Sequence, residues 1–406
     1  MSWETTIAES RYHTQDESYY CGAATAMIIL AEIGVSYSSL DQDDLYNSNH
    51  THNSHSSSSG WYTDAEGLCY TLNNRRPESF YPKQFAVSKD TTEDNAVRAL
   101  VWALVDYKVS PGALVFDGAH WNVVCGVRTG QDPYGGNYTI EGFYHQNPVY
   151  FSPPPPPPHN ATDACGSGGP HGITTEFTTY DAWLADWFTG FNYDDPNGNK
   201  QWISVDGSTK VNIQLPKKPL SSSPLQGKEL ITPEQATKAA SSGMAEHKLA
   251  ESGPLSSVLK KGSLGDPVVV HRLDRPGQYY YLSPWEQDSG IGGFAEVDAR
   301  FGNFKGFRAF PSPIKELLIG SEARNRLQSE IATRVDGLRI ERPQGNGFVV
   351  VKPGTYGQLP VLVWRPCRES WSPSLPFYMV TTGTHTVYVR IDGKVFTDLA
   401  TSARGG

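Results

Sequence analysis

Charged residues, cysteines and long apolar runs are all scarce in this chain. Charged residues make up 19% of the 406 residues, and there are five cysteines. No apolar run approaches the roughly 18 residues that a membrane-spanning helix requires, so we expect no membrane span. The first residues, MSWETTIAES, lack a basic region followed by an apolar one, so we expect no signal peptide in this sequence.

The charge balance restricts the classes of partner. The formal net charge is −9, and no cluster of lysine or arginine offsets it. A negative surface repels phosphate groups, so we expect no nucleic-acid partner and no attraction to an anionic membrane. The polar first half, rich in asparagine and tyrosine, favours a secreted or cell-surface bacterial protein, with the cytoplasm as the alternative.

Glycine, proline and aromatic residues are abundant. The 39 glycines, 29 prolines, 21 tyrosines and 10 tryptophans are typical of strands joined by loops. The chain length predicts about two to three domains. We expect an α+β fold with one domain over 1–207, a Pro/Ser/Lys-rich linker over 208–229, and two small α+β units over 230–313 and 314–406.

Two polar segments of the first half and the cysteines of the whole chain give further expectations. We expect a polar loop at 47–61 and a rigid polyproline loop at 152–160. Because five is an odd number, at least one cysteine is free or paired with another chain. A disulfide bond between Cys69 and Cys165 is one of the alternatives.

The two C-terminal units follow the same order of elements. The run ITPEQATKAA predicts a helix with Thr232 as N-cap and Gln235 completing a capping box. Strand-like runs follow, and similar runs recur about 90 residues later, which suggests an internal repeat. The runs lie at 267–273, 279–285 and 293–307, and then, behind a helix-like segment at 321–332, at 360–366, 376–382 and 386–399. This order resembles the cystatin-like PepSY modules, through the helix start and the turns in VDARFG and RIDGKVF.

The stretch QDESYYCGAATAMIILAEIG, residues 15–34, places Cys21 at the start of an apolar helix that Gly34 ends. The helix is apolar nearly all round, which predicts burial. The partial positive charge at a helix N-terminus lowers the pKa of a thiol there, so the position favours a reactive thiolate. The alternative is a small buried residue without chemistry, as free cysteines usually are.

A reactive thiol needs a base, and the base needs an orienting group. His120 starts the strand-like run HWNVVCGV after a tight DGA turn, and Asn147 ends the next run. Asp132 is the rival third member, but its turn-rich surroundings favour a turn role. His145 and His171 are the rival bases, and we expect His145 to leave the strand and lie at the surface.

Together these residues resemble the papain-like cysteine peptidases, most closely the bacterial branch related to leader peptidases that cut after a double glycine. The resemblance rests on Gln15, on Cys21 followed by GAA, on His120 in HWNVV and on Asn147 before a proline. It covers about residues 10–205, including an aromatic stretch at 178–192 and a strand-like run at 201–207. It implies a buried N-terminal helix packed on an antiparallel sheet.

The resemblance also implies a role for each residue. Cys21 would attack the scissile carbonyl as a thiolate, and His120 would be its ion-pair partner and then protonate the leaving amine. Asn147 would hold the imidazole in one tautomer. Gln15 and the Cys21 N–H would form the oxyanion hole. The implied activity is hydrolysis of a protein or peptide through a thioester acyl-enzyme, with neither cofactor nor metal.

Alternatives to this function remain. An amidase or a transglutaminase-type acyltransferase uses the same residues, and a binding protein keeps the fold without the activity. PepSY-like modules are associated with restraint of peptidases, so we expect contact between the C-terminal units and the cleft; substrate binding or attachment are the other uses. His50, His52 and His55 do not match a tight zinc site, and we expect them in a solvated loop.

Overall fold

The structure is a computed structural model, and it describes residues 3–6, 12–55, 60–135, 137–149, 173–207, 229–341, 348–351, 360–382, 385–400 and 404–405. The predicted polyproline loop and nearly all of the predicted linker lie outside these residues, as do Cys165 and His171. Among the described residues, no helix is both long and apolar enough to cross a membrane.

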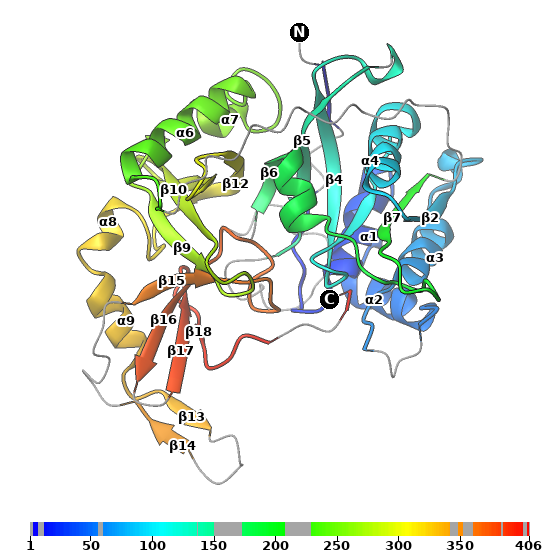
Figure 1. Ribbon diagram of the computed structural model, residues 1–406. Helices are drawn as coiled ribbons and strands as arrows, with labels where there is room; N and C mark the ends of the chain where they lie inside the picture. The colour runs from blue at the N-terminus through cyan, green and yellow to red at the C-terminus, as the bar shows by residue number, and fades with distance from the viewer. Residues whose placement is uncertain are drawn as a thin grey trace.

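Helices surround the sheet in both halves of the chain (Figure 1). They are α1 (Cys21–Glu32), α2 (Gln42–Thr51), α3 (Ala65–Arg75), α4 (Glu93–Trp102), α5 (Tyr180–Ala182), α6 (Pro233–Glu246), α7 (Ser256–Leu259), α8 (Ser321–Arg324) and α9 (Leu327–Val335). Wider π turns continue two of them, as η5 (Ala103–Tyr107) after α4 and η7 (Trp183–Trp187) after α5.

The strands of the N-terminal half are β1 (Trp3–Thr6), β2 (Phe85–Asp90), β3 (Gly112–Val115), β4 (His120–Thr129), β5 (Ile140–Asn147), β6 (Ile173–Thr179) and β7 (Trp202–Gly207). Those of the C-terminal half are β8 (Ser263–Leu264), β9 (Val268–Arg272), β10 (Tyr279–Gln287), β11 (Gly290–Asp298), β12 (Phe304–Ile314), β13 (Arg339–Glu341), β14 (Phe348–Val350), β15 (Val361–Trp364), β16 (Phe377–Thr382), β17 (His385–Arg390) and β18 (Val395–Phe396). The mixture of helices and strands confirms the α+β class.

One sheet runs through both halves. Its order is β18-β17-β16-β15-β9-β10-β11-β12-β6-β5-β4-β3-β7-β2, with β1 beside β4 and β8 beside β10. The halves join where β12 pairs antiparallel with β6, Phe307 opposite Phe177. β15 and β9 pair in parallel. The backbone hydrogen bonds of the sheet therefore tie the C-terminal half directly to the strands that follow the candidate site.

Helix α1 is the buried centre of the N-terminal half. Every residue from Cys21 to Ala31 is buried, and the helix packs on β3, β4, α2 and α3. Gly34 follows the helix with a φ of +101°, a conformation that favours glycine. The predicted apolar helix and its end are confirmed.

The C-terminal half holds the predicted elements in order. α6 begins with the capping box of Thr232 and Gln235. Each strand-like run holds one or two strands, from β9 to β12 and from β15 to β18. The helix-like segment at 321–332 is divided into α8 and α9. The repeat itself, and the domain boundaries, stay predictions.

The predicted polar loop at 47–61 is wrong at its start. Helix α2 continues through Thr51, and Asp41 caps its N-terminus by accepting the Asp44 N–H. Leu45 and Asn49 face inward from the helix and are buried. The helix was not predicted because its composition is polar and only a narrow face of it is buried.

Candidate active site

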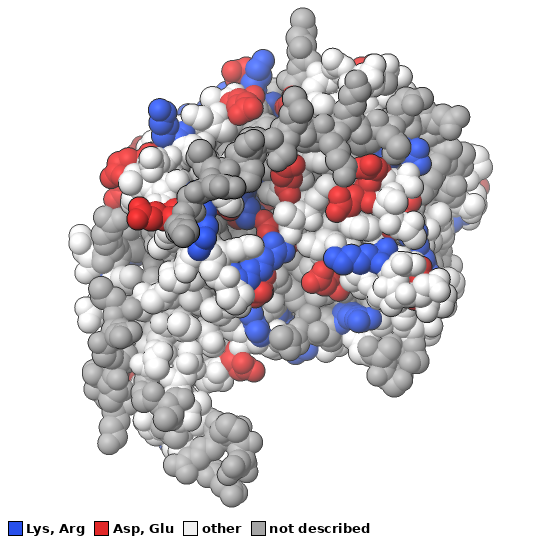
Figure 2. Space-filling model, viewed as in Figure 1, with Lys and Arg blue, Asp and Glu red and all other residues white. Residues whose placement is uncertain are grey.

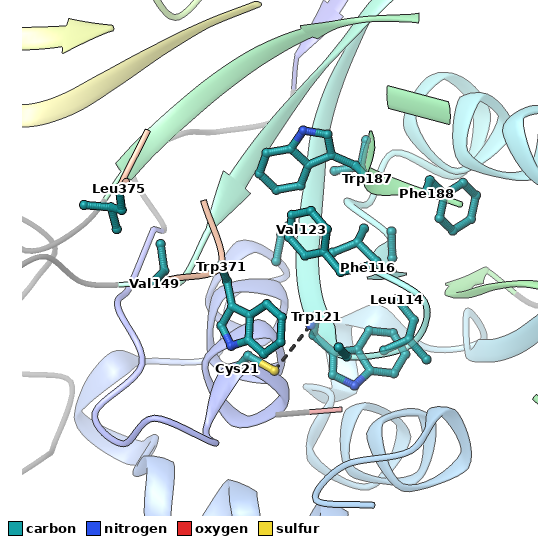
Figure 3. Packing of buried hydrophobic residues seen from close by; sticks show 14 of the residues in the cluster. Cys21, Leu114, Phe116, Trp121, Val123, Val149, Trp187, Phe188, Trp371 and Leu375 are labelled. Atoms are coloured by element: carbon teal, nitrogen blue, oxygen red, sulfur yellow. Dashed lines mark hydrogen bonds between the residues drawn. The ribbon is translucent and has the colours of Figure 1, made fainter. Parts of the chain in front are cut away.

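Cys21 is the first residue of α1 and lies against the start of β4 (Figure 3). Its Sγ accepts a hydrogen bond from the backbone N–H of Trp121 at 3.3 Å. The next residue, Gly22, packs so tightly on Thr63 that a Cβ there would lie 2.5 Å from the threonine side chain. Small residues after the cysteine therefore let the helix start approach both β4 and the segment around Thr63.

A tight turn positions His120. Phe116, Asp117 and Gly118 have φ values of 53°, 56° and 87°, so three successive residues adopt the left-handed conformation. Phe116 and Asp117 carry this conformation at a steric cost, since it favours glycine. The turn confirms the predicted DGA turn and starts β4 at His120, opposite Val115 of β3.

His120 pairs with Asn147, as predicted. Asn147 is the last residue of β5, the neighbour of β4, and its Oδ1 lies 3.0 Å from His120 Nε2. Nε2 donates in this pair because a carbonyl oxygen can only accept. Nδ1 of His120 is then the basic nitrogen, and it has no hydrogen-bond partner among the described residues. The enlarged connection between β4 and β5 accounts for the 27-residue separation of the pair.

Gln15 lies in the segment before α1. Its backbone N–H donates to Pro148 O at 2.7 Å, which ties it to the residue after Asn147. Its side-chain Nε2 donates to Glu17 O at 2.9 Å. A primary amide has a second N–H, so Gln15 keeps one donor for an oxyanion.

Burial reverses the expected protonation states. Cys21 and His120 are both 0% exposed. Burial raises the pKa of the Cys21 thiol to about 12, although the backbone N–H groups of Trp121, Gly22 and Cys21 oppose it. Burial lowers the pKa of His120 to about 3, against the effect of Asn147. The expectation of a thiolate favoured by the helix end is therefore wrong for this closed arrangement, where the neutral thiol and imidazole are favoured.

A loop of the C-terminal half covers this site. We call residues 365–376, between β15 and β16, the cover loop. Trp371 in this loop stacks on the His120 ring at 5.4 Å and 18°, and its carbonyl accepts the Asn147 Nδ2–H at 3.0 Å. In Figure 3 its indole points toward the end of α1 that carries Cys21. Arg368 Nη2 also donates to Tyr62 Oη at 3.2 Å.

A buried chain of charges connects Asn147 to the C-terminal half. Asn147 Nδ2 donates to Glu176 Oε1 on β6 at 3.2 Å. Arg308 of β12 contacts Glu176 at 2.5 Å and Glu296 of β11 at 2.7 Å. Lys305 then links Glu296 to Asp186 of η7. These ion pairs are removed from water, so each group depends on its partners.

The rival residues lie elsewhere. His145 is within β5 and buried, bonded to Asn122 and Thr178. The prediction that it leaves the strand for the surface is wrong, because β5 is a central strand between β4 and β6 and its residues from Gly142 to Asn147 are all buried. Asp132 accepts the Tyr134 N–H in a turn, as predicted.

One cluster has metal-ligand chemistry among the described residues. His55, Asp64 and Glu66 place their ligand atoms within 4.8 Å of one another. Asp64 already accepts from His55, Ser54 and the Gly67 N–H, where it caps α3. Glu66 contacts Lys89 at 2.6 Å. These protein partners explain the cluster without an ion, and His55 is held by them rather than free in a loop.

A cavity of about 380 Å³ opens beside the site, between the halves. Its lining includes Phe116, Ala119, Trp371 and Arg404, together with the acidic residues Asp117, Asp186 and Asp274. Figure 2 shows acidic and basic side chains mixed over this face of the molecule, with no broad patch of one sign. The cavity likewise combines both signs, because Arg275 lines it as well and pairs with Asp186 and Asp274.

Trp371, Glu176 and the segment 404–405 are neighbours of the site that were not predicted from the sequence. Trp371 could have been singled out, because it is a tryptophan within a Ser/Pro-rich run, RESWSPSLP, that connects two predicted strands. Glu176 had no comparable signal, since it is one polar residue among threonines in β6.

No family model matches the chain, and no curated protein matches it significantly. A search of solved structures matched the Bacillus megaterium YpeB C-terminal domain at 10% identity, covering 77% of this chain and 100% of that one. The TM-score of that match is 0.19, so it carries no information on the fold of this chain.

Proposed function

We propose that the N-terminal half is a papain-like cysteine peptidase with Cys21, His120 and Asn147 as its triad. The observation that supports it most is the His120–Asn147 pair at 3.0 Å, which leaves the basic Nδ1 of the imidazole without a partner in the described part of the chain. The same strand end contacts the Cys21 sulfur through Trp121 N–H. The imidazole and its orienting amide thus meet at the strand end that also contacts the nucleophile, while no hydrogen bond joins Cys21 Sγ to His120 Nδ1 in this closed arrangement.

In this proposal the reaction runs through a thioester. The Cys21 thiol gives its proton to His120 Nδ1, and its sulfur bonds to the scissile carbonyl carbon. The C–N bond then breaks, and the imidazolium returns the proton to the leaving amine. Water, deprotonated by the same imidazole, cleaves the thioester and restores the thiol. Gln15 and the Cys21 N–H stabilise the oxyanion, where loss of one donor costs about 10²–10³ in rate.

We further propose that the C-terminal half restrains this peptidase. Trp371 lies on His120, and its carbonyl takes an Asn147 N–H. An imidazole covered in this way is less able to become charged, which fits its lowered pKa. Movement of the cover loop would let water reach the pair and restore an ordinary balance of protonation.

The test is labelling of the full chain with iodoacetamide and with an E-64-type epoxide at pH 6, read by peptide mass spectrometry. We expect modification of Cys21 to exceed that of Cys69 by at least about tenfold once the cover loop is loosened by Trp371→Ala. We expect His120→Ala to abolish that difference. A Cys21 that reacts no faster than Cys69 in the loosened protein overturns the proposal. Added alkyl amine separates the alternatives, because a transferase yields amine adducts and a hydrolase yields acid.

A further inference from the structure

The described end of the chain, Arg404 and Gly405, which we call the tail, lies against the N-terminal half. Figure 1 shows the chain returning from β18 to end beside this half. Tyr62 N–H donates to Arg404 O at 3.0 Å, and Arg404 N–H donates to Gly60 O at 3.3 Å. These bonds form a parallel bridge between Arg404 and Trp61. The tail is thus bound through backbone hydrogen bonds at Arg404, a common way to bind peptides, and it turns at Gly405.

Gly405 is held between the turn that precedes His120 and the segment around Thr63. Its N–H donates to Gly118 O at 2.8 Å, and Gly118 precedes His120 by two residues. Thr63 lies on its other side. Thr63 packs on Gly22, next to Cys21, and its carbonyl accepts the Trp121 indole N–H at 3.0 Å. The tail therefore contacts the turn that leads into His120 and a segment that packs on the start of α1.

Glycine is the residue that fits this position. Gly405 is buried and has a φ of +69°, which favours glycine. A Cβ built there would overlap the Thr63 carbonyl and approach the Trp61 ring at 3.1 Å. Both obstacles are held in place, since the carbonyl is backbone and the indole is buried. Any larger residue would have to displace the tail.

Arginine suits the position before it. The Arg404 guanidinium lies 5.9 Å from the Trp61 ring centre and 6.0 Å from that of Phe191, within the range of cation–π attraction. Arg404 also lines the cavity that contains Asp186 and Asp274, where Arg275 already pairs with both carboxylates. The aromatic faces are therefore what favours a cationic side chain over a neutral one at this position.

We propose that the tail occupies the substrate groove in cis, and that this groove takes extended peptides in which arginine precedes glycine. The proposal rests on the peptidase function above and names the substrate class of that same site. An attached ligand has an effective concentration of up to millimolar, so the tail competes with free peptides. The tail is then a second restraint beside the cover loop.

The test is binding of a fluorescent peptide, Ser-Ala-Arg-Gly-Gly, to the full chain carrying Cys21→Ala, measured by anisotropy. We expect the additional change Gly405→Ala to displace the tail and tighten binding at least about tenfold. In that displaced protein, the peptide with alanine in place of its first glycine should bind at least about tenfold more weakly, and one with alanine for arginine about threefold or more.

The matched control is Gly337→Ala. Gly337 also has a positive φ, of +78°, but nothing lies within 4 Å of its missing Cβ. It should leave peptide affinity unchanged. Equal affinity for the glycine and alanine peptides, or no binding to the displaced protein, overturns the groove proposal. Because binding is read without catalysis, selective binding together with an unreactive Cys21 would overturn the peptidase proposal alone.

Discussion

At the scale of the residue, burial outweighs the helix end at Cys21. A helix N-terminus stabilises a nearby negative charge by about 0.3–1 kcal/mol when exposed. Burial raises the pKa of this thiol to about 12, and each unit of pKa corresponds to about 1.4 kcal/mol. Three N–H groups point at the sulfur, yet they do not compensate for the loss of water. The chemistry of this thiol therefore depends on what covers it.

Asn147 can be tested separately from its neighbours. Asn147→Ala removes the Oδ1 that holds His120 and the two N–H bonds to Glu176 and Trp371. We expect the unfolding free energy to fall by about 1–3 kcal/mol, since buried partners are left unpaired. Cys21 labelling at pH 6 in the Trp371→Ala background should fall about tenfold. Asn122→Ala, which instead loses a bond to His145, is the control for labelling.

Asp16 predicts how stability changes with pH. Burial, with Asp43, Asp41 and Glu17 nearby, raises the pKa of Asp16 to about 7. The folded state therefore retains a proton that the unfolded state releases near pH 4. The stabilisation of the folded state by this proton is complete below pH 4 and is lost as the pH rises through 7.

Asp16→Asn should remove this loss. Between pH 5 and pH 8, the unfolding free energy of the variant relative to that of the parent should increase by about 2 kcal/mol, measured by urea unfolding. Asp288→Asn is the control, because Asp288 is exposed in a turn, and its effect should stay within about 0.5 kcal/mol at both pH values. A parallel pH dependence in parent and Asp16→Asn would contradict the prediction.

At the scale of the element, the cover loop has internal contacts that fix its shape. Ser370 Oγ donates toward the carbonyls of Ser372 and Leu375, and Tyr280 Oη donates to Pro373 O at 2.6 Å. The loop is thus attached to β10 and presents Trp371 to His120 as a formed surface. Such a loop opens as a unit rather than residue by residue.

Trp371→Ala should open the site. We expect Cys21 labelling at pH 6 to rise at least about tenfold, because water then reaches His120 and its pKa returns toward the ordinary range. Trp285→Ala is the matched control, since Trp285 is a buried tryptophan of the C-terminal half packed on Phe307. Each change should cost about 3–5 kcal/mol of stability. Equal labelling in both variants would mean that general loosening, not uncovering, exposes the cysteine.

At the scale of the whole molecule, a shared sheet and buried charges join the halves. β6 and β12 pair across the junction, with Arg308 opposite Glu176. Burial raises the pKa of Glu176 to about 7 even with Arg308 beside it. The junction is therefore held by groups that cannot be separated without leaving a charge in an apolar environment.

Arg308→Met should weaken this junction strongly. It leaves Glu176 and Glu296 without their shared cation, and we expect a loss of about 3–5 kcal/mol in the free energy of unfolding. Arg334→Met is the control, because its ion pair with Glu330 is a partly exposed pair within one helix and contributes little to stability. A loss below about 1 kcal/mol for Arg308→Met would show that backbone pairing alone holds the halves.

Local patterns predicted most of the elements that position the site. The capping box at Thr232, the left-handed turn at Gly118 and the apolar helix from Cys21 to Gly34 each depend on neighbouring residues. The burial of His145 was mispredicted because it depends on β4 and β6, which pair with β5 on either side. Polar composition similarly concealed α2, whose few inward residues pack on other helices.

The sequence by itself determined the residue types, their order and the elements on which Cys21, His120 and Asn147 lie, because strand and helix periodicity are local properties. Only the tertiary structure decided that His120 and Asn147 meet at 3.0 Å, that Trp371 covers them and that Arg404 and Gly405 return to the same place. These contacts join residues up to hundreds of positions apart. Their energies come from excluding water and from shape, which no local pattern encodes.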